Sequence, residues 1–175
     1  MNDVYLIENI LEDTKREKLI KDVQPLLLSG KEFQKLFPDM EYKPGKRTLA
    51  ELYSHPDFRE VQQSIVDKIN QYFYSLFLLL KENRFNINAK VHKSWIFSTR
   101  GQREFWHTHP EADWAAVYYI KTVPFFDNGT LFRSGLFKAP QNSLILFPGW
   151  LRHSAPTFPF RFNRYTWGMD LTVVA

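Results

Sequence analysis

The pair His107-Thr108-His109 is the sharpest chemical feature of the sequence. In a β-strand, residues two positions apart project from the same face, so both imidazoles could bind one metal ion. A third histidine, His153, follows 44 residues after His109, which leaves enough chain for intervening strands to return it to the pair. Three imidazoles on one side of an ion leave positions open for substrate and dioxygen, and imidazole suits iron, zinc, copper or nickel. The spacing predicts a catalytic metal site, and the simpler interpretation is hydrogen-bonded histidines without a metal.

Two carboxylates beside this pair could complete a metal site in another way. Glu111 lies two residues after His109, but Pro110 between them disturbs a strand and is better read as the end of that strand. Asp113 could reach the ion from the following loop or orient an imidazole. We therefore predict His107, His109 and His153 as the ligands and keep Glu111 and Asp113 as reserve candidates.

A second polar constellation lies near the C-terminus, at Arg164-Tyr165-Thr166. On a strand, Arg164 and Thr166 share a face, where a guanidinium can hold a carboxylate through two parallel hydrogen bonds and a threonine hydroxyl can donate a third. The pattern predicts an anion-binding floor, although a strand arginine paired with a surface acid looks the same in sequence. Arg161 is the reserve candidate for the grip. Candidate lining residues of the same pocket are Tyr118, Tyr119, Trp95 and Phe97, although aromatic residues on alternating strands are more often part of a core.

The elements that must position these groups change in kind near residue 84. After it, short β-type runs alternate with turns, at residues 91–99, 103–109, 114–123, 129–134, 143–148 and 164–174. Strands at this spacing without alternating helices predict a sandwich or jelly roll rather than a parallel sheet. We therefore expect a mainly β protein with N-terminal helices.

Two helices are expected before residue 84. Thr14 and Glu17 have the spacing of a capping box that would open the first helix, whose apolar face extends to Leu27. The second helix follows His55, with Pro56 in its first turn and apolar residues three or four positions apart. Both helices are expected to cover one outer face of the barrel. The prediction is a single domain over residues 1–175, with 1–83 as helical support and 84–175 as the barrel core.

Composition narrows the class of protein. With 175 residues, 44% of them hydrophobic and 17% aromatic, the chain can bury one sizeable core. It has no cysteine, which excludes disulfides, thiolate metal sites and a cysteine nucleophile. The segment MNDVYLIENILED carries acids where a signal peptide needs basic residues, and no apolar run approaches the ~20 residues of a membrane helix. We expect a cytoplasmic protein with no membrane partner. The net charge of +4 comes from scattered Lys and Arg, so nucleic acid is not an expected partner.

From Trp95 to Val174 the sequence resembles the 2-oxoglutarate-Fe(II) oxygenases, in particular a small prolyl-hydroxylase-like group whose strand reads His-x-His-Pro followed by Val-Tyr-Tyr. The matching stretches are, in chain order, HTHPEADWAAVYYI, SLILFPGWLRHSAP and RYTWGMDL. The order of histidine pair, VYY strand, Phe-Pro turn, histidine and arginine carries the resemblance, since each piece alone is weak.

The resemblance implies a double-stranded β-helix, a cupin-like jelly roll, in which Fe(II) lies at the barrel mouth and is chelated by 2-oxoglutarate, with dioxygen as the other cosubstrate. By position, His107 and His153 match the two histidines of the family's iron triad. Arg164 with Thr166 matches the pair that holds the distal carboxylate. The chain departs from the family at His109, because most members carry Asp or Glu there. A neutral imidazole leaves the iron one charge more positive.

These features predict a dioxygenase that uses 2-oxoglutarate and hydroxylates a C–H bond of a protein or peptide side chain or of a small metabolite. Two alternatives stay open. One is a three-histidine, cupin-type dioxygenase that binds its substrate directly on iron without 2-oxoglutarate, which the all-histidine set fits without exception. The other is a non-catalytic barrel that binds a peptide or nucleic acid through its basic surface and needs no metal. The loops at residues 30–55 and 124–140 are expected to decide the substrate.

Overall fold

Strands outnumber helices in the described part of the protein. The computed structural model describes residues 3–39, 45–49, 52, 55–79, 88–99, 105–158 and 162–174. Within these residues the strands are β1 (Tyr5–Glu8), β2 (Leu28–Ser29), β3 (Lys46–Arg47), β4 (Asn88–Thr99), β5 (Trp114–Lys121), β6 (Gly129–Phe132), β7 (Gly135–Lys138), β8 (Ser143–Pro148), β9 (His153–Ser154) and β10 (Arg164–Val174). The helices are α1 (Asp13–Val23), α2 (Gly30–Leu36) and α3 (Pro56–Leu79), with a 3-10 turn at Gln24–Leu26.

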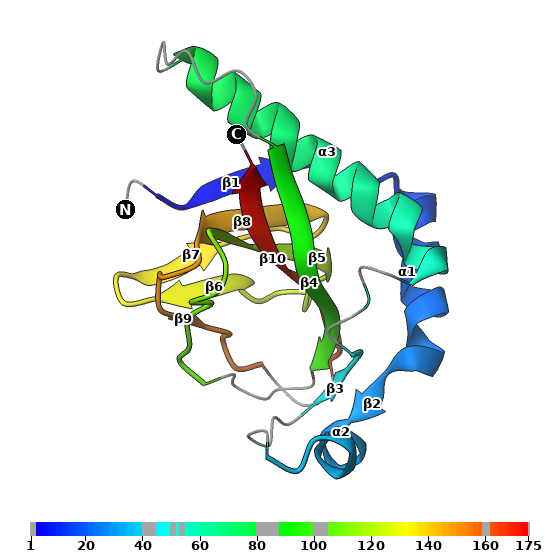
Figure 1. Ribbon diagram of the computed structural model, residues 1–175. Helices are drawn as coiled ribbons and strands as arrows, with labels where there is room; N and C mark the ends of the chain where they lie inside the picture. The colour runs from blue at the N-terminus through cyan, green and yellow to red at the C-terminus, as the bar shows by residue number, and fades with distance from the viewer. Residues whose placement is uncertain are drawn as a thin grey trace.

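The strands form two antiparallel sheets that pack against each other (Figure 1). In the described part of the chain, the larger sheet has the order β1-β8-β5-β10-β4-β3-β2 and the smaller one the order β7-β6-β9. Phe132 of β6 packs with Tyr119 of β5 and Phe147 of β8 between them. From β5 onward the chain passes back and forth between the two sheets, which makes the barrel a double-stranded β-helix. The predicted fold class is confirmed.

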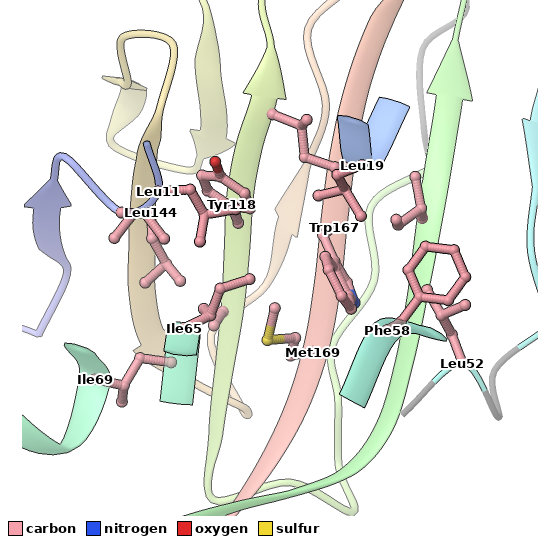
Figure 2. Close-up of a cluster of buried hydrophobic side chains, with 14 of the residues drawn as sticks. Leu11, Leu19, Leu52, Phe58, Ile65, Ile69, Tyr118, Leu144, Trp167 and Met169 are labelled. Atoms are coloured by element: carbon pink, nitrogen blue, oxygen red, sulfur yellow. The ribbon is translucent and has the colours of Figure 1, made fainter. Parts of the chain in front are cut away.

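Helices α1 and α3 cover the outer face of the larger sheet (Figure 1). Figure 2 shows the core between these helices and the sheet, where Leu19 of α1 and Phe58 and Ile65 of α3 lie over strand residues that include Trp167. The rings of Phe58 and Trp167 meet edge to face with centroids 6.2 Å apart, a favoured arrangement for aromatic pairs. This cover agrees with the prediction for the two N-terminal helices. No helix among the described residues is long and apolar enough to cross a membrane.

One of the two predicted helix starts is confirmed and the other is wrong. The second helix begins at Pro56, as expected. The capping box at Thr14 is wrong, because α1 already begins at Asp13 and its N-cap residue, Glu12, makes no side-chain cap bond. A capping box forms instead at Ser29, whose hydroxyl accepts from the Glu32 backbone while the Glu32 carboxylate accepts from the Ser29 backbone. It opens α2, a helix that was not predicted.

The predicted strand at residues 103–109 is wrong over its described part, residues 105–109. There the chain makes one isolated β-bridge, between His107 and His153. The backbone amide of His109 bonds to the carbonyl of Gly149 instead of continuing that register. Because the partner segment turns at Gly149-Trp150, no regular ladder can form along it. The other predicted strands are present, with shifted ends, and the sequence analysis missed β1, β2, β3, β7 and β9.

Candidate metal centre

The three histidines predicted as ligands converge at the cavity between the sheets. One ring nitrogen from each lies within 4.8 Å of the others, a spacing that a single ion can bridge. The Nε2 atoms of His109 and His153 are 3.3 Å apart. His153 is buried and the other two are partly exposed, so the cluster is reachable from one side. The donor set is three imidazoles, which suits Fe(II) among the transition metals.

Backbone bonds bring the histidines together from distant parts of the chain. His107 and His153 exchange N–H to carbonyl bonds of 3.0 Å each, and the amide of His109 donates to the carbonyl of Gly149 at 2.8 Å. Glycine is required at that turn, because a Cβ on Gly149 would lie 2.1 Å from the carbonyl oxygen of Ala112. The turn that begins at Gly149, directly after β8, therefore sets the position of the histidine pair.

Each imidazole is oriented by a partner at its Nδ1 atom. Nδ1 of His107 lies 2.8 Å from the carbonyl oxygen of Phe105, and Nδ1 of His153 lies 3.0 Å from that of Leu151. A carbonyl can only accept, so Nδ1 carries the proton in both rings and leaves the Nε2 lone pair for a metal. Nδ1 of His109 lies 2.7 Å from a carboxylate oxygen of Asp170. Sequence reasoning missed Asp170, although it continues the alternation Arg164, Thr166 along β10.

The two reserve carboxylates are occupied elsewhere. Glu111 is exposed and pairs with Lys93. The hydrogen bond from Lys93 holds the pKa of the Glu111 carboxyl below its usual value. The carboxylate of Asp113 accepts the backbone N–H of Val173 at 2.8 Å. Neither side chain belongs to the cluster of possible metal ligands in the described chain.

Arg164 and Thr166 face the same cavity as the histidines. Both lie on β10 and are buried, with exposed fractions of 3% and 9%. The guanidinium carbon of Arg164 lies 5.2 Å from the ring centroid of Phe158, so an apolar neighbour limits its movement. The structure thus brings both predicted polar groups to one cavity. Arg161, the reserve candidate, falls outside the described residues.

Of the four aromatic residues predicted to line the pocket, Tyr119, Trp95 and Phe97 do so, and Tyr118 does not. Tyr118 points to the helix side of β5, where it is fully buried and its hydroxyl donates to Asn142. Burial raises the pKa of the Tyr118 phenol, so that hydroxyl stays protonated. The hydroxyl of Tyr119 lies 2.6 Å from that of Thr130 on the cavity side. Because β5 is buried on both faces, its sequence shows no alternation that could tell the two tyrosines apart.

Trp95 forms one wall beside His109. The two rings stack with centroids 5.8 Å apart and an interplanar angle of 23°. The indole crosses β10 over Gly168, where a Cβ would lie 2.9 Å from the Trp95 ring. A residue without a side chain at position 168 therefore lets the indole lie against the strand and support the imidazole.

The fold has known counterparts, although no protein-family model and no curated protein matches the sequence. A viral collagen prolyl hydroxylase from Paramecium bursaria Chlorella virus-1, in a 2-oxoglutarate complex, is 16% identical with a TM-score of 0.61, over 99% of this chain and 97% of that one. An oxidoreductase of the 2OG-Fe(II) oxygenase family from Burkholderia pseudomallei is 10% identical with a TM-score of 0.67, over 97% and 84%. A prolyl-4-hydroxylase from Pseudomonas putida is 13% identical with a TM-score of 0.59, over 96% and 91%. At these identities, the likeness shows the double-stranded β-helix fold that these oxygenases share.

Proposed function

We propose that this protein is an Fe(II)- and 2-oxoglutarate-dependent dioxygenase. The observation that carries the proposal is one cavity lined both by His107, His109 and His153 and by the buried pair Arg164 and Thr166. A dicarboxylate that chelates a metal needs a metal ion at one end and a cationic side chain for its distal carboxylate at the other. The fold that this chain shares with 2OG-Fe(II) oxygenases supports the same conclusion.

The histidines fit Fe(II) by their chemistry and by their orientation. Their Nδ1 atoms face fixed acceptors, so their Nε2 atoms would hold the ion on one side and leave the other side open. Bound Fe(II), with 2-oxoglutarate and dioxygen, supplies the oxidising power for hydroxylation of an unactivated C–H bond. The part of this chain is to hold the ion, bind the cosubstrate and orient both.

Arg164 would bind the distal carboxylate of 2-oxoglutarate through its planar guanidinium, and the Thr166 hydroxyl would donate a further hydrogen bond. The cavity that holds both groups is small, with a volume of about 60 Å³. The cavity therefore favours a compact cosubstrate.

We propose a protein or peptide side chain as the substrate, ahead of a small metabolite. Two exposed aromatic residues lie next to the candidate metal centre. Phe105 lines the cavity and has 56% of its surface exposed. Trp150 is 67% exposed and follows Gly149, whose carbonyl accepts a hydrogen bond from the His109 amide. Exposed aromatic side chains are typical of surfaces that bind polypeptides. Two proteins of similar fold are prolyl hydroxylases, one of them acting on collagen by its name.

A three-histidine dioxygenase that binds its substrate directly on iron is the second candidate. The all-histidine ligand set favours it. It gives no role to the buried Arg164 and Thr166 in the same cavity, which is why we place it second.

An anaerobic titration separates these functions. Apoprotein is loaded with Fe(II) and then with 2-oxoglutarate, and the weak visible charge-transfer band of an iron–oxoacid chelate is recorded. The proposal expects this band in the wild type and its loss in His107→Ala and Arg164→Ala. Bound iron without the band would favour the direct three-histidine dioxygenase. Absence of iron binding would reject both enzymes and leave a non-catalytic binding barrel.

A further inference from the structure

The three-histidine cluster has no negative charge to compensate a bound metal cation. Neutral imidazoles bring no negative charge to a divalent cation, so the ion would keep its full charge inside a partly buried site. Glu111 and Asp113 do not compensate it, because one pairs with Lys93 and the other binds the Val173 backbone. The side chain of Asp170 does approach the cluster, with a carboxylate oxygen 2.7 Å from Nδ1 of His109.

The partner of Nδ1 distinguishes His109 from the other two ligands. His107 and His153 face neutral backbone carbonyls. His109 faces an anion, and the two side chains are nearly buried, at 11% and 8% exposure. The contact lies at ion-pair distance but off the line of an ideal N–H to oxygen bond.

Neighbouring groups fix both the plane of the His109 ring and the orientation of its two nitrogens. Its plane is held between the indole of Trp95 and the imidazole of His153, with ring centroids 5.8 Å and 5.0 Å away and interplanar angles of 23° and 15°. Asp170 then determines which nitrogen carries the proton, because a carboxylate beside Nδ1 favours a proton on that atom. Nε2 is left facing the other histidines.

We propose that Asp170 is a positioning residue that supplies, through His109, the negative charge that a carboxylate ligand would otherwise bring to the metal. The inference rests on the proposed function, since it requires a divalent metal at the three histidines. A carboxylate that accepts from a ligating imidazole orients the ring and raises its basicity. Three neutral histidines and one aspartate carry the same total charge as two histidines and a ligating carboxylate. The charge is therefore kept and moved one residue outward.

A purely structural role for Asp170 is the competing interpretation. Asp170 lies opposite Lys93 on β4, next to a register shift between Asp170 and Leu171. However, the ammonium of Lys93 is directed to Glu111, which leaves the Asp170 carboxylate turned toward the imidazole. A structural role would change stability without changing metal affinity in a way that depends on His109.

The test measures Co(II) and Fe(II) affinity anaerobically on chelator-treated protein, independently of turnover. The variants are Asp170→Asn, which keeps the shape and removes the charge, Asp170→Glu, which keeps the charge, and Glu111→Gln as the control. Glu111→Gln removes a carboxylate of the same region that contacts Lys93 instead of a histidine. His109→Asp and the double variant His109→Asp/Asp170→Asn complete a cycle. Thermal melting of each apoprotein reports folding.

We expect Asp170→Asn to weaken metal binding roughly 10–100-fold, Glu111→Gln to change it by no more than about twofold because that pair is exposed, and Asp170→Glu to recover part of the loss. In the His109→Asp background, Asp170→Asn should cost no affinity, because the charge then binds the metal directly. Should Asp170→Asn not fold, Asp170→Ser replaces it as the neutral variant in both backgrounds, with the same expected results.

Two results would overturn the inference while leaving the proposed function intact. One is a folded Asp170→Asn protein with wild-type metal affinity. The other is an equal loss from Asp170→Asn in both backgrounds, which would mean that Asp170 acts without His109. A wild-type protein that binds neither metal would instead contradict the proposed function itself.

Discussion

Replacement of Arg164 is the perturbation that most directly tests the carboxylate grip. Arg164 is 3% exposed and faces the cavity, so solvent screens its bond to a bound dicarboxylate only weakly. Losing a buried guanidinium–carboxylate contact of this kind costs about 3 kcal/mol. Since 1.4 kcal/mol corresponds to a factor of about ten, Arg164→Ala should raise the 2-oxoglutarate concentration for half-maximal turnover roughly 100-fold, with a smaller change in kcat.

Graded variants separate charge, geometry and packing at this position. Arg164→Lys keeps the charge but loses the planar fork, so we expect an intermediate effect. Thr166→Val removes one hydroxyl and should cost about 1 kcal/mol, or roughly fivefold. Arg164→Met retains the apolar stem that packs near Phe158, and it should behave like Arg164→Ala in binding but melt closer to the wild type.

The assay is succinate formation against 2-oxoglutarate concentration, paired with anaerobic titration of the iron-loaded protein and thermal melting. A folded Arg164→Ala protein with an unchanged 2-oxoglutarate requirement would refute the assignment and transfer it to Arg161. Unchanged turnover with no 2-oxoglutarate at all would refute the cosubstrate itself.

Three further predictions concern the surroundings of the site. Gly149→Ala should lower both the melting temperature and Co(II) affinity, because its Cβ would meet the Ala112 carbonyl at 2.1 Å, and wild-type values in both measurements would contradict this. Tyr119→Phe should raise the 2-oxoglutarate requirement, whereas Tyr118→Phe should only lower stability, by about 1 kcal/mol; equal effects on turnover would contradict the assigned faces of β5. Ile65→Ala, at a fully buried position of α3, should lower the free energy of unfolding by about 2–5 kcal/mol in denaturant titration, and a loss below about 0.5 kcal/mol would mean that the helix does not pack as described.

Much of the fold was predictable because its signals are local. The apolar spacing after Pro56 predicted α3, and short β-type runs separated by turn residues predicted β4, β5, β6, β8 and β10. The failures have identifiable physical causes. The 103–109 strand was wrong because its partner segment turns at Gly149-Trp150. The capping box at Ser29 and Glu32, which opens α2, was not recognised in the sequence.

The sequence by itself determined which groups could perform the chemistry. Spacing by two residues places His107 with His109 and Arg164 with Thr166, because side chains in extended chain alternate between faces. Chain order was enough to expect His153 to return to the pair, since a barrel brings successive strands back to the same cavity.

Only the tertiary structure decided which other residues join the site. Asp170 contacts His109 from β10, while the acids that are near in sequence, Glu111 and Asp113, point elsewhere. Tyr119 faces the cavity and Tyr118 does not, because a shift of one residue reverses the face of a strand. Contacts between strands depend on the register of pairing and on burial of both faces, and neither quantity is written in the local pattern of residues.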